Sequence, residues 1–315
     1  MYINSVGFYI PETRVTNEYF AEKNGLSSDW IVQRTGIISR AKASEKETID
    51  YMCNKAVADA LPNLPYSIKE VDMIVFASYT PSDTIATTGY VIQREYGIED
   101  AKVFHISSAC SSGINAMEVI STFLHSGLVT KALLICADRN STYSDDKDSI
   151  SGHLWGDAAT AYFISDETYG EKTPQIIDVT SQGLGHIGIG PKAVFLDPKG
   201  SGLQMPYGRD VFMYACNYIA RNTDAILSIN GYTPDDLSYF ISHQANMRIM
   251  INVAKQLGLK DEQMLSNIAE LGNTGSASAL LVFAQNIDRF VSGDLICISV
   301  FGGGYSAGSC LINIQ

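Results

Sequence analysis

Short apolar runs rich in β-branched residues alternate along this chain with longer stretches that carry apolar residues on one helical face. The runs predict buried strands because they are too short for helices and almost wholly apolar. They cover residues 73–77, 132–136, 239–242 and 295–300. Between them, one helical face is predicted from Ile49, Met52, Cys53, Ala56, Val57 and Ala60. Alternation of this kind predicts helices layered on a sheet, the α/β class.

A second amphipathic helix is predicted in the later part of the chain. Val211, Ala215 and Ile219 recur at helical spacing. Asp210 comes directly before them and is a residue type that favours the N-cap position. The pattern therefore predicts a helix that begins after Asp210.

The two halves of the chain contain a weak repeat. Residues 74–78 resemble residues 238–242, and a Ser-Gly pair precedes a predicted strand in each half. Under this alignment a helix beginning near Cys110 corresponds to one beginning near Ser276. Chance matches are common in α/β proteins, but a true duplication would bring these two helix starts together about a pseudo-dyad. We expect an N-terminal half at 1–168 and a C-terminal half at 169–315, with a tight boundary, because no Pro/Gly/Ser-rich linker separates them.

Charge and composition exclude several classes of protein. The 22 Lys and Arg residues against 34 Asp and Glu give a net charge of −12, and without a basic cluster a nucleic-acid partner is not expected. No apolar run approaches the roughly 18 residues that a membrane helix needs. The start of the chain does not resemble a signal peptide, so we expect a cytoplasmic protein. The six cysteines form no CxxC pair, so neither a metal site nor a disulfide framework is predicted.

Cys110 is the first residue with an arrangement suited to chemistry. It follows a predicted short strand at 103–106 and precedes an apolar helix through residues 114–124. A thiol at a helix N-terminus is exposed to the positive end of the helix dipole, which favours the nucleophilic thiolate. The alternative is a buried structural cysteine, and the small residues around Cys110 favour the functional interpretation.

His243 and Asn273 complete a possible catalytic set. His243 follows the predicted strand 239–242, so it is expected at the carboxyl edge of the sheet, where α/β active sites gather. Asn273 lies between two glycines and is also compatible with a simple turn. The order Cys, His, Asn occurs in papain-like hydrolases as well, so spacing alone leaves two interpretations open. Papain-like enzymes carry the cysteine near the mature N-terminus, whereas about a third of this chain precedes Cys110.

Six longer motifs identify a family resemblance. They are residues 29–37 (DWIVQRTGI), Ala109-Cys110, Gly156-Asp157-Ala158, residues 243–248 (HQANMR), Gly272-Asn273-Thr274 and residues 301–304 (FGGG). In this order, and nearly end to end, the chain resembles a β-ketoacyl-acyl-carrier-protein (ACP) synthase III, a thiolase-like condensing enzyme. The resemblance implies the thiolase-like duplicated five-layer αβαβα fold and a homodimer.

The resemblance also implies an acyltransferase mechanism. Cys110 would take an acyl group as a thioester, with the N–H groups of Cys110 and Gly303 as the oxyanion hole. His243 and Asn273 would donate hydrogen bonds to a malonyl thioester while it loses carbon dioxide. The resulting enolate would attack acyl-Cys110 to give 3-oxoacyl-ACP in fatty acid biosynthesis. The substrates are then a coenzyme A thioester and malonyl-ACP, with no permanently bound cofactor and no metal.

Binding roles follow from the same matches. Trp30 and Arg34 resemble the residues that hold the nucleotide end of coenzyme A, and Asn246 would contact its pantetheine arm. Phe301 would pack against His243. Arg248 and Lys255 match residues that receive the acyl carrier protein. Ile85 stands where a partner subunit's phenylalanine usually closes the acyl pocket.

Departures from the family pattern favour an alternative within the same chemistry. Ser149 stands where an arginine usually stacks on adenine, and Met213 and Gln256 stand where lysines are common. These changes, with Ile85, suit a synthase III-like ketosynthase of a specialised lipid or polyketide pathway that uses a longer or carrier-bound acyl donor. A cysteine hydrolase is the alternative from another class.

Overall fold

The first half of the chain contributes five strands to a large mixed sheet. The computed structural model describes residues 1–170 and 172–315. The spatial order of the five strands is β5-β4-β6-β7-β1. Their bounds are Tyr2–Tyr9 for β1, Met73–Ala77 for β4, Lys102–Ile106 for β5, Lys131–Arg139 for β6 and Asp157–Ser165 for β7. The predicted strands at 73–77 and 132–136 are confirmed as β4 and the middle of β6.

The second half continues the same sheet in the order β11-β12-β13-β8. The bounds are Pro174–Gly183 for β8, Tyr239–Ser242 for β11, Leu295–Gly302 for β12 and Ser306–Ile314 for β13. Tyr2 of β1 pairs with Gln175 of β8 and so joins the two parts. The predicted strands at 239–242 and 295–300 are confirmed as β11 and most of β12.

Strand directions repeat from one half to the other. In the first half β1 and β7 are antiparallel, β7 and β6 are antiparallel, and β6, β4 and β5 are parallel. In the second half β8 and β13 are antiparallel, β13 and β12 are antiparallel, and β12 and β11 are parallel. A parallel bridge between Phe240 and Met264 takes the place of the β4–β5 pair. The weak sequence repeat thus corresponds to a repeated topology, in which residues 74–78 and 238–242 occupy equivalent strands.

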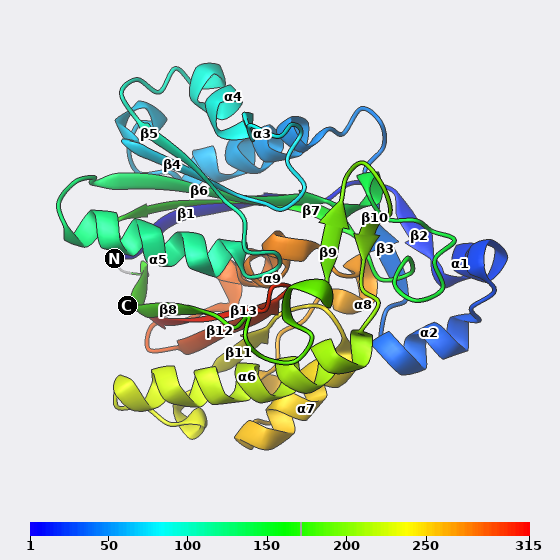
Figure 1. Cartoon of the computed structure of the whole chain (residues 1–315). Coiled ribbons are helices and arrows are strands. Elements are labelled where there is room, and N and C mark those ends of the chain that lie inside the picture. The colour runs from blue at the N-terminus through cyan, green and yellow to red at the C-terminus, as the bar shows by residue number, and fades with distance from the viewer. Residues whose placement is uncertain (171) are drawn as a thin grey trace.

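Helices form three layers around the two parts of the sheet (Figure 1). The outer face of the first part is covered by α3 (Ile49–Ala60) and α4 (Thr88–Glu95). Between the two parts lie α5 (Ser112–His125) and α9 (Ser278–Gln285), which are largely buried and apolar. The outer face of the second part is covered by α6 (Gly208–Ile229) and α7 (Met247–Leu257). This arrangement is the five-layer αβαβα fold that the resemblance implied.

The remaining elements lie at one side of the layers. They are α1 (Asn17–Asn24), α2 (Ser28–Thr35), α8 (Ile268–Leu271) and two antiparallel pairs, β2 (Arg14–Thr16) with β3 (Ser39–Ala41) and β9 (Phe195–Asp197) with β10 (Gly202–Gln204). Figure 1 shows α1 and α2 projecting beside β2 and β3. These segments surround the functional site described below.

One predicted helix boundary was wrong. The helix expected after Asp210 begins at Gly208, so Asp210 lies in the first turn of α6 and is not its N-cap. The Asp210 carboxylate instead accepts hydrogen bonds from the Ile189 amide at 3.0 Å and the Tyr305 hydroxyl at 2.6 Å. A local capping pattern cannot predict hydrogen bonds of this kind, because their donors are distant in the sequence.

The described residues 1–170 and 172–315 include no helix long and apolar enough to cross a membrane. All six cysteines are buried free thiols. In the same two segments, no group of three or more His, Cys, Asp or Glu side chains is arranged to hold a metal ion.

Candidate active site

A tight turn holds Cys110 between β5 and α5. Ala109 has a φ of +51°, a left-handed conformation that is unusual for a residue with a Cβ. The turn is held by the Ser108 amide, which donates to Ser112 Oγ at 2.8 Å. Gly302, at the end of β12, packs against the turn so closely that an added Cβ would lie 2.8 Å from the Cys110 nitrogen. The sharp turn and the bare glycine together place Cys110 at the start of α5 under the end of β12.

Burial opposes ionisation of the Cys110 thiol. Desolvation, followed by the nearby Asp138 charge, raises the pKa of Cys110 to about 12. The sequence suggested a thiolate favoured by the helix N-terminus, and the direction found is the reverse because burial outweighs the dipole. Cys110 is therefore a neutral thiol at pH 7.

His243 is a buried, neutral imidazole. It follows β11, its backbone N–H donates to the Ser299 carbonyl at 2.9 Å, and its side chain is almost fully buried. Desolvation lowers the pKa of His243 to about 4. Ring nitrogen Nδ1 lies 2.9 Å from Ser278 Oγ at the start of α9. When Ser278 donates to Nδ1, the ring proton resides on Nε2, which is then a hydrogen-bond donor.

Asn273 is held by its backbone and by its own amide oxygen. Its N–H donates to the Leu154 carbonyl at 2.8 Å, and its carbonyl accepts from the Gly156 amide at 2.9 Å. Side-chain Oδ1 accepts from the Gly275 amide at 3.0 Å. Since Oδ1 is occupied in this way, the amide presents its Nδ2 donors to the site.

Three cavities lie in series around these residues. The inner cavity, about 40 Å³, is lined by Cys110, His243, Asn273, Phe301 and Gly303, among others. The large cavity, about 770 Å³, shares Cys110 and Gly303 with it. The entrance cavity, about 420 Å³, shares Met205 with the inner cavity. The shared residues therefore make the inner cavity a neighbour of both the large cavity and the entrance cavity.

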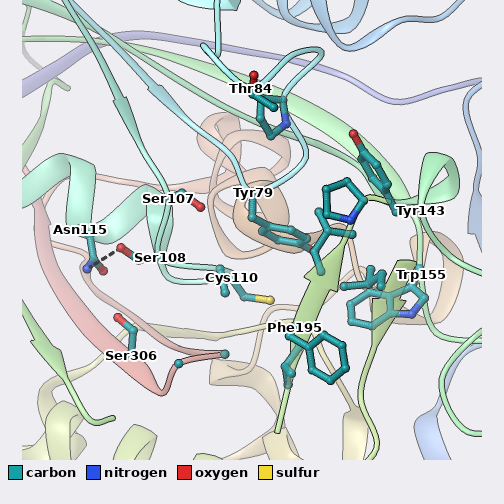
Figure 2. A pocket seen from close by; sticks show the side chains of 18 of the residues that line it. Tyr79, Thr84, Ser107, Ser108, Cys110, Asn115, Tyr143, Trp155, Phe195 and Ser306 are labelled. Atoms are coloured by element: carbon teal, nitrogen blue, oxygen red, sulfur yellow. Dashed lines mark hydrogen bonds between the residues drawn. The ribbon is translucent and has the colours of Figure 1, made fainter. Parts of the chain in front are cut away.

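The side chains around the large cavity differ from one side to the other (Figure 2). The Cys110 sulfur points toward Trp155 and Phe195, and the Tyr79 ring lies beside it. Ser108 and Asn115 lie on the opposite side and are joined by a hydrogen bond of 3.2 Å. The thiol is therefore next to an aromatic wall.

The entrance cavity collects four of the predicted binding residues. Trp30 and Arg34 lie one turn apart on α2, with the guanidinium 5.2 Å from the indole ring centre. Asn246 is the N-cap of α7, where its Oδ1 accepts from the Arg248 amide at 2.8 Å. Arg248 also lines this cavity, as does Arg209. Several cationic side chains thus surround the opening of a chain that is negative overall.

Three other predicted residues lie elsewhere. Phe301 lines the inner cavity together with His243, and its ring contacts Tyr305 at a centroid distance of 4.9 Å. Lys255 lies in the last turn of α7 and does not line the entrance cavity. Ile85 is 77% exposed and lies outside this chain's large cavity, although Asp83 and Thr84 line it.

The sequence analysis missed several residues of the site. Ser278, Asn140, Tyr79 and Trp155 contact or surround the predicted catalytic set. Ser278 follows the Gly272-Asn273-Thr274 motif by four residues, and this short separation is the local signal that could have marked it. Tyr79 and Asn140 lie far from Asn273 along the chain, so no local pattern marked them.

A thiol, a neutral imidazole and an amide from the two halves of a duplicated αβαβα fold define a thiolase-like condensing enzyme. The family models for 3-oxoacyl-ACP synthase III and its C-terminal region match residues 104–185 and 227–314. The β-ketoacyl-ACP synthase III of Sodalis glossinidius is 32% identical over 98% of both chains. This chain belongs to the 3-oxoacyl-ACP synthase III family of acyltransferases, as the motif resemblance predicted.

Solved structures agree with this assignment. The 3-oxoacyl-ACP synthase III of Aquifex aeolicus superimposes with a TM-score of 0.92 and 30% identity, covering 99% of each chain. The priming β-ketosynthase of the R1128 polyketide pathway gives a TM-score of 0.90 and 26% identity, covering 99% of this chain and 96% of the other. Family membership favours a condensing enzyme over a cysteine hydrolase.

Proposed function

We propose that this chain loads an acyl group on Cys110 and condenses it with malonyl-ACP, with loss of carbon dioxide, to give 3-oxoacyl-ACP in fatty acid biosynthesis. The observation that carries the proposal is that Cys110, His243 and Asn273 all line one small inner cavity. A nucleophile and two neutral hydrogen-bond donors are the groups that this reaction needs. Protein groups supply the chemistry, so the proposal includes no resident cofactor.

The first half-reaction transfers the acyl group. Cys110 Sγ forms a bond to the thioester carbonyl carbon, the bond from that carbon to the coenzyme A sulfur breaks, and the thiol proton leaves with coenzyme A. The N–H groups of Cys110 and Gly303 would stabilise the tetrahedral oxyanion. The acyl chain would then lie in the large cavity.

The second half-reaction uses His243 and Asn273. Both would donate hydrogen bonds to the malonyl thioester carbonyl, so that the electrons left by departing carbon dioxide form a stabilised enolate. Its carbon attacks acyl-Cys110, the bond from the acyl carbon to the Cys110 sulfur breaks, and the released thiolate takes a proton from water. An amide does not accept a proton at pH 7. Asn273 therefore suits decarboxylation better than proton abstraction.

The entrance cavity suits phosphorylated and acidic partners. Trp30 and Arg34 would hold the nucleotide end of coenzyme A, and Asn246 the pantetheine arm. Arg248 and Lys255 would receive the acidic acyl carrier protein. Cationic side chains at the opening of a chain with net charge −12 support this assignment.

Two variants test whether Cys110 and Asn273 act in different half-reactions. Cys110→Ala should abolish the acyl-enzyme, detected by intact-protein mass spectrometry, while malonyl-CoA decarboxylation continues. Asn273→Ala should do the reverse, because it removes a donor to the enolate and leaves the nucleophile. Equal loss of both partial reactions in each folded variant would contradict these roles.

A homodimer is the assembly that we propose for this enzyme. β5 is an edge strand of the large sheet, and an edge strand has backbone groups free to pair with another chain. Phe104 on β5, Ile85, and Tyr90 and Val91 on α4 are exposed apolar side chains that a partner could cover. Light scattering that finds a monomer at assay concentrations would remove this proposal.

The six free cysteines fit a reducing compartment, and we propose the cytoplasm.

A specialised ketosynthase is the second candidate function. The large cavity beside Cys110 measures about 770 Å³ in the single chain, and Ile85 of a partner, smaller than the family's usual phenylalanine, would leave more of it open. Mass spectrometry after mixing with acetyl-CoA, a medium-chain acyl-CoA or an acyl-ACP distinguishes the candidates. A fast acetyl adduct on Cys110 supports the initiating synthase of fatty acid elongation. Preference for the longer or carrier-bound group supports a specialised pathway.

A further inference from the structure

Asn140 connects three segments that meet beneath the site. It follows the end of β6 and is fully buried. Its Nδ2 donates to the Gly156 carbonyl at 2.7 Å and to the Asn273 carbonyl at 3.3 Å. Its Oδ1 accepts from the Tyr79 hydroxyl at 2.6 Å. The side-chain amide therefore uses its donors and its acceptor to join β6, the Asn273 loop and the end of β4.

Tyr79 supports the same loop at a second point. Its backbone N–H donates to Asp138 at 3.0 Å, which holds the residue beyond the end of β4. A Cβ added to Gly275 would lie 2.7 Å from the Tyr79 hydroxyl oxygen, so the loop packs directly on that hydroxyl. Gly275 is also the residue whose amide donates to Asn273 Oδ1. The hydroxyl thus contacts the residue that orients the Asn273 amide.

The pair contacts the Asn273 loop at two points. Asn140 holds the Asn273 backbone carbonyl, and Tyr79 lies against the glycine that holds the Asn273 side chain. The aromatic ring of Tyr79 faces the large cavity beside Cys110 (Figure 2). A side chain of the cavity wall is therefore part of the support for Asn273.

We propose that Tyr79 and Asn140 are positioning residues that fix Asn273 for the decarboxylation step. The inference rests on the proposed role of Asn273 as an enolate-stabilising donor. Loss of the Tyr79 hydroxyl leaves Asn140 Oδ1 without its donor and opens space under Gly275, so the Asn273 amide moves from its aligned position. Misplacement of an aligned group by about 1 Å reduces a rate by roughly 100-fold.

The hydrogen-bonded pair persists across the working pH range. Burial raises the pKa of the Tyr79 hydroxyl well above its ordinary value, so the hydroxyl stays protonated and remains a donor. Asn140 does not titrate. Removing the pair should therefore lower the rate of decarboxylation without changing the shape of its pH profile.

The test compares the two partial reactions in Tyr79→Phe and Asn140→Leu. The probes are malonyl-CoA, for carbon dioxide release, and hexanoyl-CoA, for the adduct on Cys110. We expect decarboxylation to fall roughly 10- to 100-fold, the range typical for loss of an orienting partner, while acylation of Cys110 changes less than about threefold. Two variants are used so that the test survives a folding defect in one of them.

Tyr96→Phe is the matched control. The Tyr96 hydroxyl also donates to an asparagine side chain, Asn54 Oδ1, at 3.2 Å, but this pair lies away from the three cavities. Both partial reactions should be unchanged in this variant. Equal loss of acylation and decarboxylation in Tyr79→Phe, or unchanged decarboxylation in both variants, would overturn the inference.

A double variant separates positioning from general destabilisation. If Tyr79 acts through Asn273, adding Tyr79→Phe to Asn273→Ala causes little further loss of decarboxylation, whereas independent effects multiply. Multiplying effects would overturn the inference. Unimpaired decarboxylation in Asn273→Ala itself would instead refute the proposed role of Asn273, so the two failures are distinguishable.

Discussion

Burial sets the protonation states of the titratable pair in the inner cavity. Desolvation raises the pKa of Cys110 to about 12 and lowers that of His243 to about 4. Both groups are consequently neutral at pH 7. The resting site holds an uncharged thiol and a neutral imidazole, and the imidazole is in the form that can donate a hydrogen bond to the proposed enolate.

The buried histidines predict how stability depends on pH. Desolvation lowers the pKa of both His243 and His153 from 6.5 to about 4. Below pH 6.5 the unfolded chain binds protons that the folded chain does not bind until about pH 4. Their contribution to the free energy of unfolding is therefore fully present above pH 6.5 and is lost as the pH falls toward 4, by about 1.4 kcal/mol per pH unit for each group.

Urea unfolding at pH 7, 6 and 5 measures this contribution. Replacing one histidine, in His243→Gln, should reduce the pH dependence between pH 6 and 5 by about 1 kcal/mol relative to the wild type. His125→Gln is the control, because His125 is exposed at the end of α5. An unchanged slope in His243→Gln would show that His243 is protonated in the folded protein at these pH values.

Among the secondary-structure elements, the end of β6 is a place where hydrogen bonds join the two halves of the chain. Asp138 is fully buried there and accepts from the Ser276 amide at 2.7 Å, the Tyr79 amide at 3.0 Å and the Thr80 hydroxyl at 2.9 Å. Tyr79 and Thr80 follow β4, whereas Ser276 precedes α9 of the other half. A single carboxylate therefore fixes the Asn273 loop to the first half of the chain.

Asp138→Asn should destabilise the protein and impair catalysis together. An amide presents N–H groups to at least one of these donors and leaves it unsatisfied, which we expect to cost roughly 3 kcal/mol of unfolding free energy. Decarboxylation should fall as well, because the loop that carries Asn273 loses an anchor. Denaturant unfolding and carbon dioxide release measure the two effects.

Asp59→Asn is the control variant for Asp138→Asn. The Asp59 carboxylate is exposed and accepts from the Phe8 amide at 3.0 Å, and asparagine keeps an acceptor oxygen. We expect its stability to change by less than about 0.5 kcal/mol. A similarly small change in Asp138→Asn would mean that the buried carboxylate contributes little to joining the halves.

Charge is distributed unevenly over the whole molecule. The net charge is −12, yet Arg34, Arg209 and Arg248 all line the entrance cavity. Lys255 lies farther along α7, outside that cavity. A free coenzyme A thioester would contact the cavity itself, whereas a carrier protein would cover a wider area that includes Lys255.

Lys255→Glu should therefore discriminate between donors. We expect KM for malonyl-ACP to rise about tenfold with little change in kcat, because opposite charge mainly assists encounter and docking. The kinetic constants for malonyl-CoA should be unaffected. Lys69→Glu, in a remote 3-10 turn, should alter neither. A parallel change in both malonyl donors would place Lys255 outside carrier-protein docking.

Local pattern was sufficient to predict the α/β class and the strands at 73–77 and 239–242, because periodicity is encoded in neighbouring residues. Contiguous motifs also marked Cys110, His243 and Asn273 as candidates, and these three residues line one cavity. Other features depended on the packed halves. The Tyr79–Asn140 support, the Asp138 anchor and the altered pKa values of Cys110 and His243 arise from contacts and burial contributed by distant segments. Such contacts exist only after β4, β6 and the Asn273 loop meet in space, so the tertiary structure alone decided them.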